Sequence, residues 1–193
     1  TLLLSLCFLA ISGQLFIKFL IYHQARIDAV DSIGIRFNDL ILDQLPVGDF
    51  SIYIFGITYS CLLMFVLFRI KKIKELSQFV TAYALILLTR MITISLVPLK
   101  EPSSLVSLDD PILYNVIFSN EITADLFYSG HTAFVFVMYF LSKKPIYAVL
   151  GGILGVLLMM QRVHYSIDIA VAIPFAYGIA KCVEWFFSKI SEK

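Results

Sequence analysis

The chain has 193 residues, of which 60% are hydrophobic and only 15% are charged, and its mean hydropathy is +0.89. Soluble domains are only about 45–50% apolar, so a soluble core could not bury this much apolar surface. The formal net charge of +1 argues against a nucleic-acid partner. The composition therefore predicts an integral membrane protein whose solvent is partly lipid.

Six apolar stretches follow one another, with no repeat, low-complexity segment or soluble linker between them. A spanning helix needs about 20 mostly apolar residues, so each stretch is a candidate span, although the fourth and fifth are short. The candidate spans are residues 2–22, 51–68, 76–97, 131–141, 146–160 and 167–187. We expect one all-α domain over residues 1–193, an integral membrane bundle of six transmembrane helices.

The charged residues divide unequally between the two ends of these helices. One end carries most of the cations and few acids, namely Arg69, Lys71, Lys72, Lys74, Lys143, Lys144, Lys181, Lys189 and Lys193, with Glu75, Glu184 and Glu192. Lys and Arg collect on the cytoplasmic side of membrane proteins. We therefore expect both termini in the cytoplasm and six alternating crossings. The loops at the other end then face the extracellular, periplasmic or lumenal side.

The first of those loops, within residues 24–50, has apolar residues at helical spacing, with charged residues between them. The apolar positions are Ile27, Val30, Ile33, Phe37, Leu40 and Ile41. This pattern predicts an amphipathic helix lying on the membrane surface. Its role stays open between simple loop packing and a lid or wall at which lipid enters.

His164 and Asp168 are four residues apart at the start of the last candidate span. In a helix they would share one face and could hydrogen-bond. A carboxylate that binds one ring nitrogen fixes the tautomer and leaves the lone pair of the other nitrogen free. His164 is therefore a candidate nucleophile toward phosphorus, oriented by Asp168. His131 is the candidate general acid that protonates the departing alkoxide.

Phosphoryl transfer also needs donors for the phosphate oxygens. The guanidinium groups of Arg90 and Arg162 could bind phosphate bidentately. Ser129 and Gly130 stand at a predicted helix start, where backbone N–H groups bind anions, and glycine lets the backbone approach closely. These residues form the candidate phosphate-binding site.

Plainer roles compete for several of these residues. Asp125 is expected to cap or orient the helix that carries His131, and Tyr165 is either an orienting residue or an interfacial aromatic. Arg90 could instead pair with an acidic loop residue. The two histidines with Asp168 or Asp125 could also hold a metal ion.

Two segments resemble the motifs of one family. Residues 125–132, DLFYSGHT, resemble the D-x-x-x-S-G-H-T motif of the sphingomyelin synthases, and residues 164–169, HYSIDI, resemble their H-Y-[ST]-x-D-[VI] motif. Arg90 begins a looser match to the family's R-x-x-T segment, and Arg162 is similar to the inositol-phosphoceramide branch. Thr123, with the alanine after it, departs from the Cys-Gly that precedes the aspartate in the family. The family belongs to the type 2 phosphatidate phosphatase superfamily.

The resemblance implies transfer of a phosphocholine-type headgroup from a glycerophospholipid to ceramide or a diacylglycerol-like lipid alcohol. It implies a phosphohistidine intermediate and neither metal nor other cofactor, with His164 as nucleophile, Asp168 as its orienter and His131 as general acid. Attack by water in place of a lipid alcohol would make the protein a lipid phosphatase. A non-catalytic lipid-binding membrane protein is the second alternative.

Overall fold

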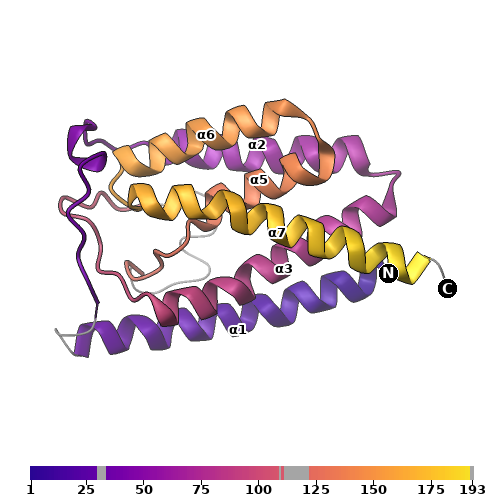
Figure 1. The fold of residues 1–193 in the computed structure, drawn as a ribbon, viewed down its shortest axis with the longest axis horizontal. Coiled ribbons are helices and arrows are strands. Elements are labelled where there is room, and N and C mark those ends of the chain that lie inside the picture. Colours follow the sequence, from indigo (N-terminus) through magenta and orange to yellow (C-terminus); the bar gives the residue numbers. More distant parts are fainter. Residues whose placement is uncertain (30–33, 109, 111–121, 192–193) are drawn as a thin grey trace.

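The computed structural model describes residues 1–29, 34–108, 110 and 122–191 of the chain. The described part is all-helical, with no β-strand, and contains six α-helices. They are α1 (Leu2–Ala29), α2 (Ser51–Arg69), α3 (Ile73–Leu96), α5 (Gly130–Ser142), α6 (Pro145–Met160) and α7 (Ser166–Ser191). The helices run side by side along the long axis of the molecule, and both ends of the chain lie at the same end of this bundle (Figure 1).

Four of the helices, α1, α2, α3 and α7, are long and apolar enough to cross a membrane. The predicted α-helical membrane class is confirmed to this extent. The helices α5 and α6 are apolar but have only 13 and 16 residues. At 1.5 Å per residue they extend about 20 and 24 Å, against a hydrocarbon core of about 30 Å. Six crossings therefore stay a prediction.

Local sequence signals set the start of α5 and the sharp hairpin between α5 and α6. The hydroxyl of Ser129 accepts a hydrogen bond from the N–H of Thr132 at 3.4 Å and so caps the start of α5. Lys143 ends that helix in a left-handed conformation, with φ at 56°. Pro145 then opens α6 at a position where its missing N–H costs no helical hydrogen bond.

Small residues let the central helices approach closely. A Cβ atom at Gly151 of α6 would lie 2.8 Å from the ring of Phe136 on α5, and one at Gly155 would lie 2.6 Å from Cγ2 of Ile169 on α7. Small residues at helix contacts are typical of membrane bundles. These contacts pack α6 closely against α5 and α7, the two helices whose starts carry the candidate site.

Of the predicted amphipathic helix, Ile27 lies in the last turns of α1, and the prediction is wrong over residues 34–50. After Gly34, with φ at 102°, the backbone extends and Ile35 forms an isolated parallel bridge to Leu99. Ile35 donates its N–H to the carbonyl of Pro98 at 3.0 Å and accepts from the N–H of Lys100 at 3.1 Å. These bonds replace those a helix would make, and only a 3-10 helix, η1 (Leu42–Gln44), follows. The expected positions 30 and 33 lie outside the described residues.

Candidate functional site

The starts of α5 and α7 meet at the end of the bundle opposite the termini (Figure 1). The N–H of Ser129, just before α5, donates to the carbonyl of Asp168 in the first turn of α7 at 3.2 Å. This bond joins the two segments that carry the family-like motifs. His131 and His164 consequently line the same cavity.

His164 and Asp168 form the hydrogen-bonded pair that their spacing predicts, although His164 lies two residues before α7 begins. The distance from Nδ1 of His164 to Oδ2 of Asp168 is 3.3 Å, and Asp168 is fully buried. The same Oδ2 accepts the N–H of Tyr165 at 2.9 Å. In this geometry Nδ1–H donates to the carboxylate, and Nε2 keeps a lone pair for chemistry.

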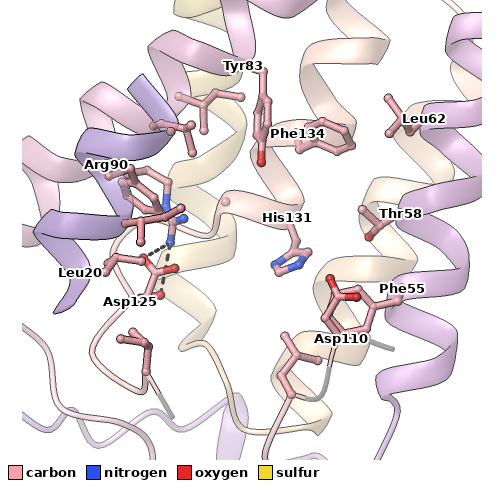
Figure 2. A pocket seen from close by; sticks show the side chains of 18 of the residues that line it. Leu20, Phe55, Thr58, Leu62, Tyr83, Arg90, Asp110, Asp125, His131 and Phe134 are labelled. Atoms are coloured by element: carbon pink, nitrogen blue, oxygen red, sulfur yellow. Dashed lines mark hydrogen bonds and ion pairs between the residues drawn. The ribbon is translucent and has the colours of Figure 1, made fainter. Parts of the chain in front are cut away.

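His131 projects from the first turn of α5 into the middle of the cavity (Figure 2). On one side lie Arg90 and Asp125, and on the other lie Asp110 and Phe55. The ring of Phe55 meets the imidazole edge-to-face, with centroids 5.7 Å apart. The cavity therefore has a cationic wall and an acidic, aromatic wall with an imidazole between them.

Arg90 forms the cationic wall and is itself held firmly. Its Nε donates to the carbonyl of Tyr128 at 2.8 Å, and its Nη2 pairs with Oδ1 of Asp125 at 2.6 Å. Among the described residues Nη1 makes no hydrogen bond, and it lies against Gly130. The predicted pairing with an acidic loop residue and the predicted position at the site are thus both found. Asp125 orients the arginine, while Ser129 supplies the cap of α5.

Two of the candidate phosphate-binding residues, Ser129 and Arg162, do not present side chains to the cavity. Ser129 is fully buried, and its hydroxyl is used in the cap of α5. Arg162, in a turn with φ at 60°, points instead to η1, where Nη2 donates to the carbonyl of Leu45 at 3.3 Å and Nη1 lies 3.6 Å from Asp43. The expected phosphate contact of Arg162 is corrected accordingly: its partners are in the first loop.

Tyr165 is a structural residue rather than an interfacial aromatic. Its hydroxyl donates to the carbonyl of Lys100 at 3.0 Å and accepts the N–H of Phe37 at 3.4 Å. Burial raises the pKa of this hydroxyl, so it remains a donor at neutral pH. Tyr165 orients the site only through its backbone N–H, which binds Asp168.

Two further polar residues carried no signal in the sequence: Tyr59, which lines the cavity, and Gln161, which binds the lining residue Ser107. Tyr59, inside the apolar α2, donates its hydroxyl to Oδ2 of Asp110 at 2.7 Å. Gln161, fully buried after α6, accepts the N–H of Phe50 at 2.8 Å and donates to Ser51 and to the carbonyl of Ser107. A polar side chain beside or within an apolar stretch is the only sign that the sequence offers for such residues. That sign does not say which residue the side chain binds.

From its polar end the cavity, with a volume of about 790 Å³, continues between α1 and α2 over a floor formed by α3. Its lining side chains on these helices are mostly apolar: Leu9, Gly13, Phe16, Ile17, Leu20, Phe55, Thr58, Tyr59, Leu62, Val66, Leu76, Phe79, Val80, Tyr83, Ile86 and Leu87. The floor from Leu76 to Arg90 is about 21 Å long at 1.5 Å per residue. We call this part the apolar groove. It is longer than one leaflet's hydrocarbon, about 15 Å.

The fold and the cavity define an α-helical membrane protein with a buried polar site at one end of a deep apolar groove. No protein-family model matches the chain, and no curated protein and no solved structure matches it either. Over the described ranges, no three His, Cys, Asp or Glu side chains are grouped as ligands for a metal ion.

Proposed function

We propose that the chain is a membrane-embedded phosphotransferase that moves a phospho-headgroup from a glycerophospholipid to a lipid alcohol. The observation that carries the proposal is the hydrogen-bonded His164–Asp168 pair on the same cavity as His131 and Arg90. The resemblance to sphingomyelin synthases supplies the reaction type, and the apolar groove supports a lipid substrate.

In the first half-reaction Nε2 of His164 attacks the phosphorus of the donor. The bond between phosphorus and the diacylglycerol oxygen breaks, and His131, protonated, gives that oxygen its proton. Arg90 stabilises the charge on the equatorial oxygens. Asp168 stabilises the imidazole as it loses its lone pair to phosphorus. The products are diacylglycerol and a headgroup phosphate bound to His164.

In the second half-reaction a lipid alcohol replaces diacylglycerol. His131, now neutral, accepts the proton of the hydroxyl while the oxygen attacks phosphorus, and the phosphorus–nitrogen bond to His164 breaks. The enzyme returns to its starting protonation state. The mostly apolar lining favours a lipid alcohol such as ceramide over water as the acceptor.

The two walls of the cavity fit a zwitterionic headgroup of the phosphocholine type. The phosphate would lie beside Arg90, and the ammonium would lie toward Asp110 and the rings of Phe55 and Tyr59. Carboxylates and aromatic faces both attract ammonium groups. Figure 2 supports this division, since Arg90 and Asp110 lie on opposite sides of His131.

For the orientation in the membrane we propose six crossings with both termini in the cytoplasm, in a fold like that of the type 2 phosphatidate phosphatases. The cation-rich helix ends and the common end of both termini support this arrangement. The short α5 fits it because most of its side chains are buried in the bundle, so α5 itself need not match the bilayer thickness. The site then opens to the extracellular, periplasmic or lumenal side.

The test is turnover by the purified protein in vesicles containing phosphatidylcholine labelled in its headgroup, with and without ceramide. We expect label in ceramide and release of diacylglycerol, both abolished by His164→Ala and by Asp168→Asn. Release of label into water without a ceramide product would replace the transferase by a lipid phosphatase. Turnover that neither variant changes would indicate a lipid-binding protein, and loss of activity in a chelator, restored by a divalent ion, would contradict the metal-free mechanism.

A further inference from the structure

Asp39 lies in the loop between α1 and α2, far in sequence from the proposed catalytic residues, yet its carboxylate reaches the first residue of α7. Its Oδ2 accepts the backbone N–H of Ser166 at 2.6 Å. Its Oδ1 accepts the N–H groups of Ile41 and Leu42, both at 3.1 Å. One side chain therefore ties the first loop to the helix that carries Asp168.

The start of α7 requires an acceptor from elsewhere in the chain. The first N–H groups of a helix have no partner inside it, and a side chain just before the helix usually accepts one of them. Here that position holds Tyr165, whose hydroxyl is bonded to the carbonyl of Lys100. Asp168 supplies the reverse bond of a capping box, in which its carboxylate accepts the N–H of Tyr165, and this bond leaves the N–H of Ser166 to another acceptor. Asp39 completes the cap.

The charge of Asp39 suits this position. Burial alone would raise the pKa of Asp39, but hydrogen bonds from the N–H groups of Ser166, Leu42 and Ile41 and from the side chain of Ser166 outweigh it and hold the pKa below its ordinary value. The carboxylate is therefore ionised at neutral pH. A negative charge beside the N-terminus of a helix is stabilised by the helix dipole.

The capped turn is also the turn that forms the His164–Asp168 pair. Ser166 lies between the two residues in sequence, and Oδ2 of Asp168 accepts from both His164 and the N–H of Tyr165. A small shift at Ser166 thus moves the carboxylate that orients the imidazole. A misplacement of about 1 Å in a reacting group can cost about 100-fold in rate.

We propose that Asp39 is a positioning residue for His164: by capping α7 at Ser166, it holds the His164–Asp168 pair in the geometry for attack on phosphorus. The catalytic part of this inference rests on the proposed function. The cap itself can be tested without turnover, so the two can fail separately.

The kinetic test removes the hydrogen bond between Asp39 and Ser166, once by changing the acceptor and once by changing the donor. Asp39→Ala removes the acceptor, and Ser166→Pro removes the donor at a first helical position, where proline is well tolerated. We expect each to lower kcat about tenfold or more with little change in KM, and the double variant to be no slower than the slower single variant. Ser166→Ala keeps the N–H and loses only the hydroxyl, which is a second hydrogen-bond partner of Asp39, so its kcat should fall less than that of Ser166→Pro. If Ser166→Pro keeps the wild-type kcat, the proposal is overturned.

A matched control and a second readout separate positioning from general stability. Asp49 accepts the N–H of Ser51 at 2.9 Å at the start of α2, so Asp49→Ala removes the same kind of bond from a helix that carries none of His131, His164 and Asp168. Amide hydrogen exchange over residues 164–170 should become faster in Asp39→Ala and stay unchanged in Asp49→Ala. Unchanged exchange in Asp39→Ala would reject the cap, whether or not the wild type turns over.

Discussion

A Cβ atom at position 130 would lie 2.5 Å from Nη1 and 2.9 Å from Cζ of Arg90. The guanidinium thus occupies the space that any side chain at Gly130 would need. Its other nitrogens are fixed by Tyr128 and Asp125, so it has little freedom to retreat. The glycine of the SGHT segment therefore makes room for the arginine.

Gly130→Ala should reduce transfer activity sharply without unfolding the protein. The methyl group displaces the guanidinium from the place where it would stabilise phosphate, and losing one such donor costs about 100-fold or more in kcat. Gly152→Ala in α6 is the control, because nothing lies within 4 Å of its Cβ position. The measurement is the steady-state kcat of both variants. Equal values would contradict the placement of Arg90.

Arg90→Lys should also lose most activity, although it keeps the positive charge. A lysine cannot bind Asp125, the carbonyl of Tyr128 and a phosphate together in the way that a planar guanidinium does, so kcat/KM should fall about 100-fold. The matched control is Arg36→Lys, since Arg36 pairs with Glu101 at 3.1 Å on the surface. Exposed pairs contribute little, so that variant should behave as wild type. Full activity in Arg90→Lys would remove the arginine from the mechanism.

Filling the apolar groove should affect long lipids more than short ones. Gly13 lines the groove, and nothing lies within 4 Å of its Cβ position, so Gly13→Leu can fill it without a backbone clash. KM should rise several-fold for a long-chain donor and stay unchanged for a short-chain donor. Gly56→Leu, at an exposed position of α2 with the same open surroundings, is the control. An equal effect on both donors would place the acyl chain elsewhere.

Gln161→Leu should destabilise the loop end of the bundle. It removes the hydrogen bonds that the amide makes to the N–H of Phe50 and to the carbonyl of Ser107, both part-buried, and each such bond contributes about 0.5–1.5 kcal/mol to stability. Gln44→Leu is the control, since that amide is exposed and its one bond within the described residues is to the carbonyl of Leu40. Thermal unfolding in detergent should show a lower Tm for the first variant alone.

Helix positions were predictable because spanning helices carry a strong apolar signal. The stretch predicted at 146–160 is the helix Pro145–Met160, and the stretch predicted at 51–68 is the helix Ser51–Arg69. The first helix runs past its apolar stretch to Ala29 because tertiary contacts extend it: Gln24 accepts the N–H groups of residues 123 and 124 at 2.9 Å. The helix predicted in the first loop is wrong because the spacing of apolar residues contains no information about the backbone pairing with residues 98–100.

The candidate site was predictable where spacing encodes geometry. The motif segments indicated His131, His164 and Asp168, and the structure brings all three to one end of the bundle. The prediction that Arg162 contacts phosphate rested on its position two residues before His164. The side chain instead turns away from the cavity and binds the carbonyl of Leu45. Asp39 could not be found from sequence because its partner is 127 residues away.

The central claim is a covalent phosphorus–nitrogen bond at His164, and mass spectrometry of the rapidly quenched protein tests it most directly. The protein is mixed with phosphatidylcholine alone, quenched at alkaline pH and digested. We expect a phosphocholine adduct on His164, formed together with a burst of diacylglycerol and absent from His164→Ala. An adduct on another residue, or lipid product formed by His164→Ala at the wild-type rate, would contradict the account.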